Sequence, residues 1–219
     1  VGTSDYMLAL SEATSIENAT NHIDVKKILK DLEKDPRLQM HTGNRRQRRT
    51  AMQEIAKGVV SELYSPPRVA AAAERMGLTA GMSLDLSTTD ESGQPWDFSQ
   101  EAMRNKARRA FETQKPSLLV VCPMCGPFSS WMALNYSKMD VAAVRSKLRD
   151  ALSHLKFALE MCAEQHRRGG FFVFEHPVAA TSWGTKMMAW ILTLAGVEMV
   201  NFDFCTLGMK STNKEGAEL

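Results

Sequence analysis

The sequence predicts an α/β fold with a mostly parallel sheet, helices on both faces of that sheet, and a helical N-terminal extension. From Lys57 onward, short apolar runs alternate with longer helical patterns, an order typical of parallel strands joined by crossover helices. Two of these runs stop abruptly, one at Cys122–Ser129 and the other at Glu175–Pro177. Open parallel sheets place functional sites at the carboxyl ends of their strands, so we expect these two segments to share a pocket.

The N-terminal extension, residues 1–57, is predicted to be helical and basic. Between Val25 and Leu32 the apolar residues recur at helical spacing, and Pro36 ends this helix. A cluster of arginines follows, made up of Arg45, Arg46, Arg48 and Arg49. Guanidinium groups packed this closely can bind the phosphates of nucleic acid. The alternative is a solvated linker.

The remaining residues, 58–219, are predicted to form one α/β domain. Its strands are expected at Val59–Tyr64, Met82–Leu86, Ser117–Cys122, Phe171–Glu175 and Val197–Phe204. Its helices are expected from Ser65–Pro66 to Met76, from Gln100 to Gln114, from Asp140 to Arg168 and from Gly184 to Ala195. The last residues, Asn213–Leu219, have the composition of an interrupted loop, so we expect the domain to be truncated at its C-terminus.

Composition limits the possible classes of protein. With 219 residues, 44% of them hydrophobic, the chain can form one domain and its extension. The four cysteines do not suggest a disulfide framework, and the net charge of +2 does not indicate a partner. No apolar run is long enough to span a bilayer, and no signal peptide opens the chain. We therefore expect an intracellular protein, in the nucleus or cytoplasm, without a membrane partner.

Cys122 and Cys125 form a Cys-x-x-Cys pair at the end of the third predicted strand. A zinc or dithiol site is one interpretation, although no second pair of ligands follows, and two structural thiols are another. We favour a third, in which Cys122 points into the core and Cys125 is an exposed nucleophile. Backbone N–H groups of the turn would favour the thiolate of Cys125.

The segment Pro123–Ser129 resembles the Pro-Pro-Cys-Gln-x-Phe-Ser loop of DNA cytosine-5 methyltransferases, and Phe174–Pro177 lies where that family has Glu-Asn-Val. The resemblance implies that Cys125 is the nucleophile and Glu175 the acid. In that chemistry a thiolate adds to carbon 6 of cytosine, and carbon 5 then attacks an activated methyl group. A protonated carboxyl group at ring nitrogen 3 stabilises the charge that develops.

The resemblance extends to the binding of S-adenosyl-L-methionine, the methyl donor. Glu62–Ser65 lies where the first strand runs into the donor loop. Asp85 ends the second strand, where an acid holds the ribose, and Trp96–Phe98 resembles the step that contacts the adenine. The resemblance thus implies a Rossmann-like methyltransferase fold. The residues implied to line the cofactor site are Tyr64, Ser65, Asp85 and Asp97.

The region from Glu62 to Ala180 is also similar to a domain of retroelement-type polyproteins. Together the resemblances imply a cytosine-5 methyltransferase-like domain acting on nucleic acid, most simply DNA, in an active or a degenerate form. The alternative is a non-catalytic nucleic-acid-binding or assembly module of a retroelement polyprotein that retains the fold. A thiol enzyme that does not use S-adenosylmethionine is a third possibility.

The sequence departs from the family pattern near both proposed sites. Pro66 and Pro67 stand where glycines normally let the loop approach its ligand. Met124 and Gly126 replace the proline and the glutamine on either side of the cysteine. The Gln-x-Arg-x-Arg pattern of the family and its target-recognition domain do not occur.

Each implied site residue also has a structural interpretation. Asp85 and Asp97 suit a turn or the start of a helix, and Glu175 suits a salt-bridged strand end. His176 suits a buried histidine with satisfied hydrogen bonds. These alternatives remain open from the sequence alone.

Overall fold

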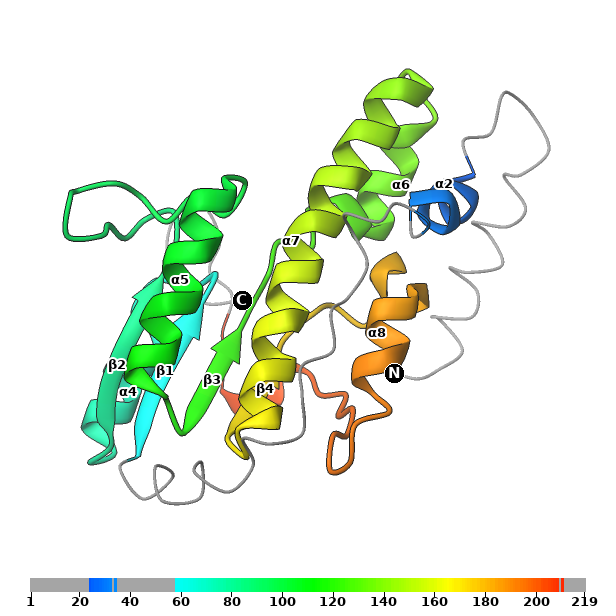
Figure 1. The fold of residues 1–219 in the computed structure, drawn as a ribbon. Coiled ribbons are helices and arrows are strands. Elements are labelled where there is room, and N and C mark those ends of the chain that lie inside the picture. The colour runs from blue at the N-terminus through cyan, green and yellow to red at the C-terminus, as the bar shows by residue number, and fades with distance from the viewer. Residues whose placement is uncertain (1–23, 33, 35–57, 209, 211–219) are drawn as a thin grey trace.

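The computed structural model describes residues 24–32, 34, 58–208 and 210. Its centre is a four-stranded sheet in which every pair of neighbouring strands is parallel (Figure 1). The strands are β1 (Val59–Leu63), β2 (Thr79–Leu84), β3 (Leu118–Val121) and β4 (Phe171–Phe174). They lie in the order β2-β1-β3-β4, so β4 forms one edge. The predicted parallel α/β sheet is confirmed.

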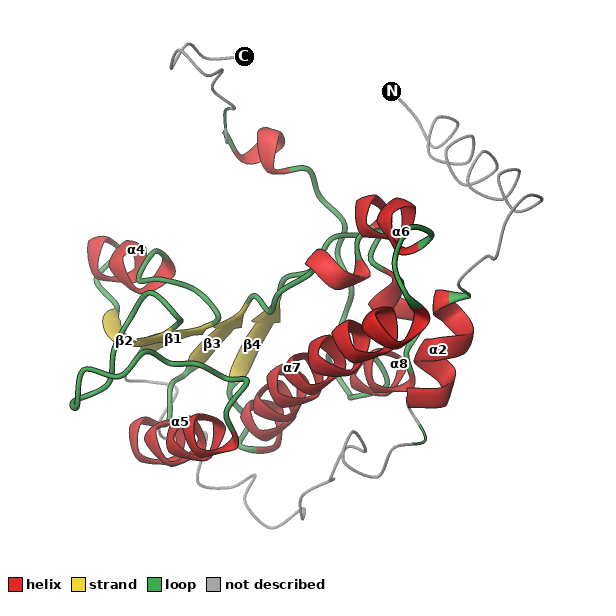
Figure 2. Cartoon of the chain, turned by 90° about the horizontal axis from the view of Figure 1, so that it is seen from above, coloured by secondary structure: helices red, strands yellow, loops and turns green. Residues whose placement is uncertain are grey.

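Helices cover both faces of the sheet, as the sequence predicts. They are α4 (Val69–Arg75), α5 (Glu101–Gln114), α6 (Ser130–Tyr136), α7 (Val141–Arg167) and α8 (Lys186–Ile191). Figure 2 shows α4 on one face of the sheet and α5 and α7 on the other. The arrangement is consistent with a Rossmann-like fold.

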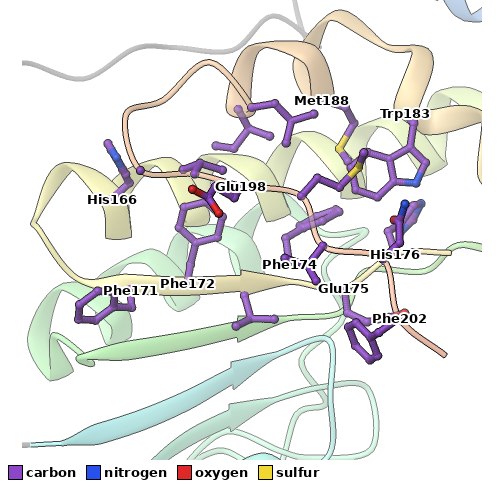
Figure 3. Close-up of a pocket in the computed structure, with 18 of the residues that line it drawn as sticks. His166, Phe171, Phe172, Phe174, Glu175, His176, Trp183, Met188, Glu198 and Phe202 are labelled. Atoms are coloured by element: carbon purple, nitrogen blue, oxygen red, sulfur yellow. The ribbon is translucent and has the colours of Figure 1, made fainter. Parts of the chain in front are cut away.

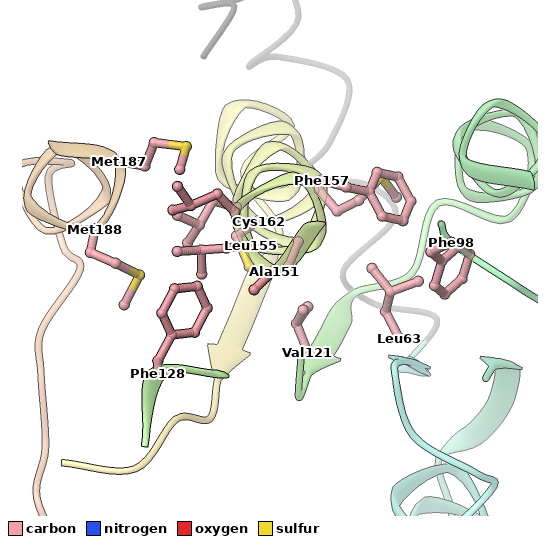
Figure 4. Packing of buried hydrophobic residues seen from close by; sticks show 14 of the residues in the cluster. Leu63, Phe98, Val121, Phe128, Ala151, Leu155, Phe157, Cys162, Met187 and Met188 are labelled. Carbon is pink, nitrogen blue, oxygen red and sulfur yellow. The ribbon is translucent and has the colours of Figure 1, made fainter. Parts of the chain in front are cut away.

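The longest helix, α7, supplies more residues to the core than any other described helix or strand (Figure 4). Its N-terminus is fixed by Asp140, whose carboxylate accepts hydrogen bonds of 2.9 and 3.2 Å from the backbone N–H groups of Ala142 and Ala143. Its buried leucines recur every three or four residues, which directs them to the sheet. They are Leu148, Leu152, Leu155 and Leu159.

The described part of the N-terminal extension packs against the same core. Helix α2 (Val25–Leu32) buries Ile28 and Leu29 and contacts α7. The amphipathic helix predicted there is confirmed. The arginine cluster, Arg45 to Arg49, lies outside the described residues.

Two predicted helices are shorter than expected. Helix α4 begins at Val69 and not at Pro66. Because Pro67 disfavours the helical conformation in the residue before it, Pro66 cannot open the helix. Helix α8 ends at Ile191, and turns up to Gly196, with its φ of 78°, replace the predicted continuation to Ala195.

The predicted fifth strand, Val197–Phe204, is wrong for the structure as described. The segment pairs with no strand among the described residues, although its composition favours a strand. Its apolar side chains are instead exposed, with Val200 at 72% and Phe202 at 54%. A strand forms by hydrogen bonding to a neighbouring strand, and no hydrogen bond between described residues joins this segment to β4.

Candidate active site at the strand ends

The two segments that the sequence singled out lie side by side at one edge of the sheet. In the register of β3 and β4, Val121 pairs with Phe174, so Cys122 and Glu175 follow at adjacent positions. The backbone N–H of Glu175 donates to the carbonyl of Val121 at 2.9 Å, and that of Cys122 to the carbonyl of Leu63 at 3.1 Å. The strand ends that carry Cys122 and Glu175 are therefore adjacent at the carboxyl edge of the sheet, as expected, while a pocket shared by Cys125 and Glu175 stays a prediction.

The loop that carries Cys125 is held by its own turn and by the core. The carbonyl of Cys125 accepts a 2.9 Å hydrogen bond from the N–H of Phe128, whose ring is buried. Ser129 then caps α6 by accepting a hydrogen bond from the N–H of Met132 at 3.2 Å. Tyr136 donates its hydroxyl to the carbonyl of Pro127. These contacts give Cys125 a defined position at the sheet edge.

The two thiols of the pair are less different than the sequence suggested. Cys122 and Cys125 are both half-buried free thiols. The prediction that Cys122 belongs to the core is therefore wrong. Burial, followed by the nearby carboxyl groups of Glu175 and Glu62, raises the pKa of Cys122 to about 11. Cys122 is therefore a poor thiolate source at neutral pH.

Glu175 lies in an environment that favours the protonated form of its carboxyl group over the charged one. Burial raises the pKa of its carboxyl group, because the charged form loses solvation at the strand end. The salt-bridged alternative finds no support, since none of the described residues forms an ion pair with Glu175. A carboxyl group with a raised pKa is suited to donate a proton to a bound base.

His176, the next residue, is buried but not satisfied as the sequence suggested. Neither of its ring nitrogens has a hydrogen-bond partner among the described residues. Its ring lies among Phe174, Phe128 and Trp183, at centroid distances of 5.6, 6.1 and 6.2 Å. Burial lowers the pKa of His176 to about 4, so the ring is neutral at physiological pH.

The donor loop after β1 is organised by Glu62. This side chain is buried, and one carboxylate oxygen accepts hydrogen bonds from the N–H of Ala70 at 2.8 Å and the hydroxyl of Ser83 at 3.1 Å. The other oxygen accepts from the N–H of Val69 at 3.1 Å and the hydroxyl of Ser65 at 2.8 Å. Glu62 therefore takes the first two N–H groups of α4.

The other backbone donors of this loop are also used. The N–H of Tyr64 donates to the carbonyl of Leu84 at 2.9 Å, and that of Arg68 to the carbonyl of Pro66 at 2.6 Å. Pro66 and Pro67 have no N–H to offer. Within residues 64–70, only the N–H of Ser65 has no partner among the described residues.

Tyr64 turns its side chain inward. Its backbone has a φ of 61°, which is unusual for a residue other than glycine. The hydroxyl lies 3.0 Å from Nδ1 of His154, and the ring packs edge-on against Phe98 at 4.9 Å. Burial raises the pKa of Tyr64, so the phenol stays neutral. Tyr64 thus supports the core under the loop.

The two aspartates implied to hold the cofactor stabilise their own turns. Asp85 accepts hydrogen bonds from the N–H and the hydroxyl of Ser87, at 2.9 and 2.7 Å. Asp97 accepts from the N–H of Ser99 at 3.0 Å and from Nε2 of Gln100 at 2.9 Å. The hydrogen bonds from Ser99 and then Gln100 hold the pKa of Asp97 below its usual range. Both contacts match the turn interpretation.

The residues present therefore do not fit an S-adenosylmethionine site of the implied kind. Such a site needs loop N–H groups that face the carboxylate of the ligand and acids that face its ribose. In this chain the loop N–H groups donate to the carboxylate of Glu62. The two aspartates accept hydrogen bonds from residues of their own turns. We derive no chemical step through this cofactor.

No group of three or more His, Cys, Asp or Glu side chains in the described ranges is placed to hold a metal ion. None of the described helices combines the length and apolarity needed to cross a bilayer. Comparisons with protein-family models, with curated proteins and with solved structures give no match for this chain.

Proposed function

We propose that this chain is a cytosine-5 methyltransferase-like domain acting on nucleic acid, in a degenerate form that keeps the thiol and the acid but not the methyl-donor site. One observation carries the proposal. Glu175, a carboxyl group whose pKa is raised by burial, lies at the end of the strand next to the cysteine loop. These are the two groups that cytosine needs before it can react at carbon 5.

The reaction available to such a pair begins once a cytosine has left its stack. A thiolate adds to carbon 6 and Glu175 donates its proton to ring nitrogen 3, which makes carbon 5 nucleophilic. Without a methyl donor, carbon 5 takes a proton from water. The hydroxide left by that water then removes the original hydrogen from carbon 5 as a proton, the thiolate departs from carbon 6, and the proton on ring nitrogen 3 returns to Glu175, which restores cytosine.

Cys125 is the residue we assign to the thiolate. It holds the position of the family nucleophile, and its loop is anchored by Phe128 and Ser129. Cys122 is disfavoured because a pKa of about 11 leaves only about one thiol in a thousand ionised at pH 8.

Calorimetry with S-adenosylhomocysteine tests the degenerate part of the proposal. We expect no binding to the unaltered chain, because the loop has one free N–H to offer. Micromolar binding would show a working donor site and would favour a complete methyltransferase. The non-catalytic module becomes the better account if the hydrogen at carbon 5 of cytosine also fails to exchange with solvent.

A further inference from the structure

A groove of about 890 Å³ runs along the outer edge of β4 (Figure 3). One wall is β4 and the residues that follow it, another is the segment Val197–Phe204, and residues of α8, among them Met188 and Ile191, also line the space. In Figure 3 this segment runs from Glu198 toward Phe202 in the same direction as β4 runs toward Glu175. We call this space the β4 groove.

The β4 wall presents unpaired backbone groups. The N–H of Phe171 donates to Ser117 and that of Glu175 donates to Val121, each at 2.9 Å, so these residues face β3. Alternate residues of a strand bond to opposite sides, and the backbone groups of Phe172 and Phe174 therefore point away from β3. Because β4 has no second neighbour in the described sheet, these groups form an open edge.

The opposite wall is unpaired as well. From Glu198 to Phe202, no backbone N–H or carbonyl has a hydrogen-bond partner within the described part of the chain. In Figure 3 the segment runs alongside β4, yet no hydrogen bond joins these two described segments. Two backbone edges thus flank one space.

The size of the groove matches a single strand. A strand residue occupies about 160 Å³, taking a spacing of about 4.8 Å between strands, about 10 Å between layers and about 3.3 Å along the strand. A volume of about 890 Å³ therefore holds five to six residues, close to the length of β4 and its flanks.

The side chains around the groove indicate what such a strand would carry. Several apolar residues are exposed on the two walls, namely Phe171, Val173, Met199, Val200 and Phe202. The charged side chains along it are acidic, at Glu198 and Asp203, and no lysine or arginine is among the described residues that line it. A complementary strand is apolar at alternate positions and basic at its ends.

We propose that the β4 groove binds an extended strand of a partner protein, with apolar residues at alternate positions and lysine or arginine at its ends. The strand bonds to Phe172 and Phe174 on one side and to the segment 198–202 on the other, and it extends the sheet. The proposal does not depend on the chemistry at Cys125, so either can fail alone.

The test uses the whole chain and a fluorescent eight-residue peptide of alternating valine and threonine with a lysine at each end. We expect saturable binding by anisotropy, and slower hydrogen exchange at the amides of Phe172 and Phe174 but not at that of Phe171. A peptide with two central valines replaced by proline keeps the charge but loses ladder hydrogen bonds, so its binding should be at least about tenfold weaker.

The second part of the test changes the charge of the groove and of the peptide ends. Glu198→Lys should weaken binding of the lysine peptide several-fold and should favour a peptide with glutamate at its ends. Glu101→Lys, at an exposed acid on α5 outside the groove, is the matched control and should change neither affinity. Equal binding of the proline peptide, unchanged exchange at Phe172 and Phe174, or no binding at all would overturn the proposal.

Discussion

The carboxylate of Glu62 accepts a 2.8 Å hydrogen bond from the backbone N–H of Ala70, and this contact ties the end of β1 to the start of α4. Loop N–H groups at this point of an α/β fold commonly face an anionic ligand. In this chain the carboxylate of Glu62 takes the place of such a ligand. Its hydrogen bonds stabilise the fold, and few loop N–H groups remain for a cofactor to bind.

Glu62→Gln should destabilise the domain by about 2–4 kcal/mol, the scale for leaving buried donors without acceptors. An amide offers one oxygen where the carboxylate offers two, so either Ala70 and Ser83 or Val69 and Ser65 would face an NH₂ group. Urea unfolding followed by circular dichroism measures the change.

Glu101→Gln is the matched control for that substitution, because Glu101 is an exposed acid in the first turn of α5. It should leave the unfolding midpoint nearly unchanged. A loss of stability equal to that of Glu62→Gln would mean that the contacts of Glu62 add nothing specific.

His176→Phe should stabilise the domain at pH 7 by about 1–2 kcal/mol, since it removes two buried nitrogens that have no partner. The new ring would lie among Phe128, Phe174 and Trp183, which already form an apolar site. A decrease in stability would indicate that a partner outside the described residues satisfies the imidazole.

The same histidine predicts a dependence of stability on pH. Its pKa is about 4 in the folded chain and about 6.5 when unfolded, so the unfolded state binds a proton first as pH falls. Stability is complete above pH 6.5 and is lost down to pH 4, by about 2–3 kcal/mol. His176→Phe should flatten this loss, but not abolish it, because burial also lowers the pKa of His154.

Strands β3 and β4 could be predicted from sequence because they are short apolar runs that end in a turn, whereas β2, with its polar and glycine residues, lies at Thr79–Leu84 and not at the predicted Met82–Leu86. The positions of β3 and β4 follow from Leu118–Val121 and Phe171–Phe174, and Asp140 marks the start of α7. The segment Val197–Phe204 has the same local signal, yet it is unpaired. Strand formation depends on a neighbouring edge, which local sequence does not contain.

The site was predictable only in part. The strand pattern placed the cysteine loop beside Glu175, but the use of Glu62 as an internal cap depends on Ser83, a residue from another strand. The double proline at Pro66 and Pro67 was the one signal that the loop is unusual. The inward turn of Tyr64 onto His154 joins residues 90 positions apart, which no local motif indicates.

Alkylation should separate the four thiols. At pH 8 we expect Cys205, which is exposed, to react first, Cys125 next, Cys122 slowly and the buried Cys162 last. The rate at Cys122 should rise about tenfold per pH unit up to about pH 11, because only the thiolate reacts. Mass mapping of the labelled peptides measures this order, and faster labelling of Cys122 than of Cys125 at pH 8 would contradict it.

The arginine cluster makes a prediction that the described residues do not test. If Arg45, Arg46, Arg48 and Arg49 contact phosphates, changing all four to glutamine should reduce the slope of log affinity against log salt by about 3 to 4 for duplex DNA. An unchanged slope would identify the cluster as a linker. Fluorescence anisotropy across a salt series gives the slope.

The last prediction concerns the proposed chemistry. Incubation of the chain with DNA that carries tritium at carbon 5 of cytosine should release tritium to water, because addition of the thiolate at carbon 6 labilises that hydrogen. Release should proceed without S-adenosylmethionine and should not accelerate when it is added. Its rate should pass through a maximum with pH, since the nucleophile must be a thiolate and Glu175 must hold its proton, and burial moves the loss of that proton to a higher pH than for an ordinary glutamate.

Substitutions assign the two roles in this exchange. Cys125→Ser should abolish the release of tritium, Glu175→Gln should slow it by about 10²-fold or more, and Cys122→Ser should leave it nearly unchanged. If Cys122→Ser loses the activity and Cys125→Ser retains it, Cys122 is the nucleophile. Unaltered release in Glu175→Gln would remove the acid from the mechanism, and with it the observation on which the proposed function depends.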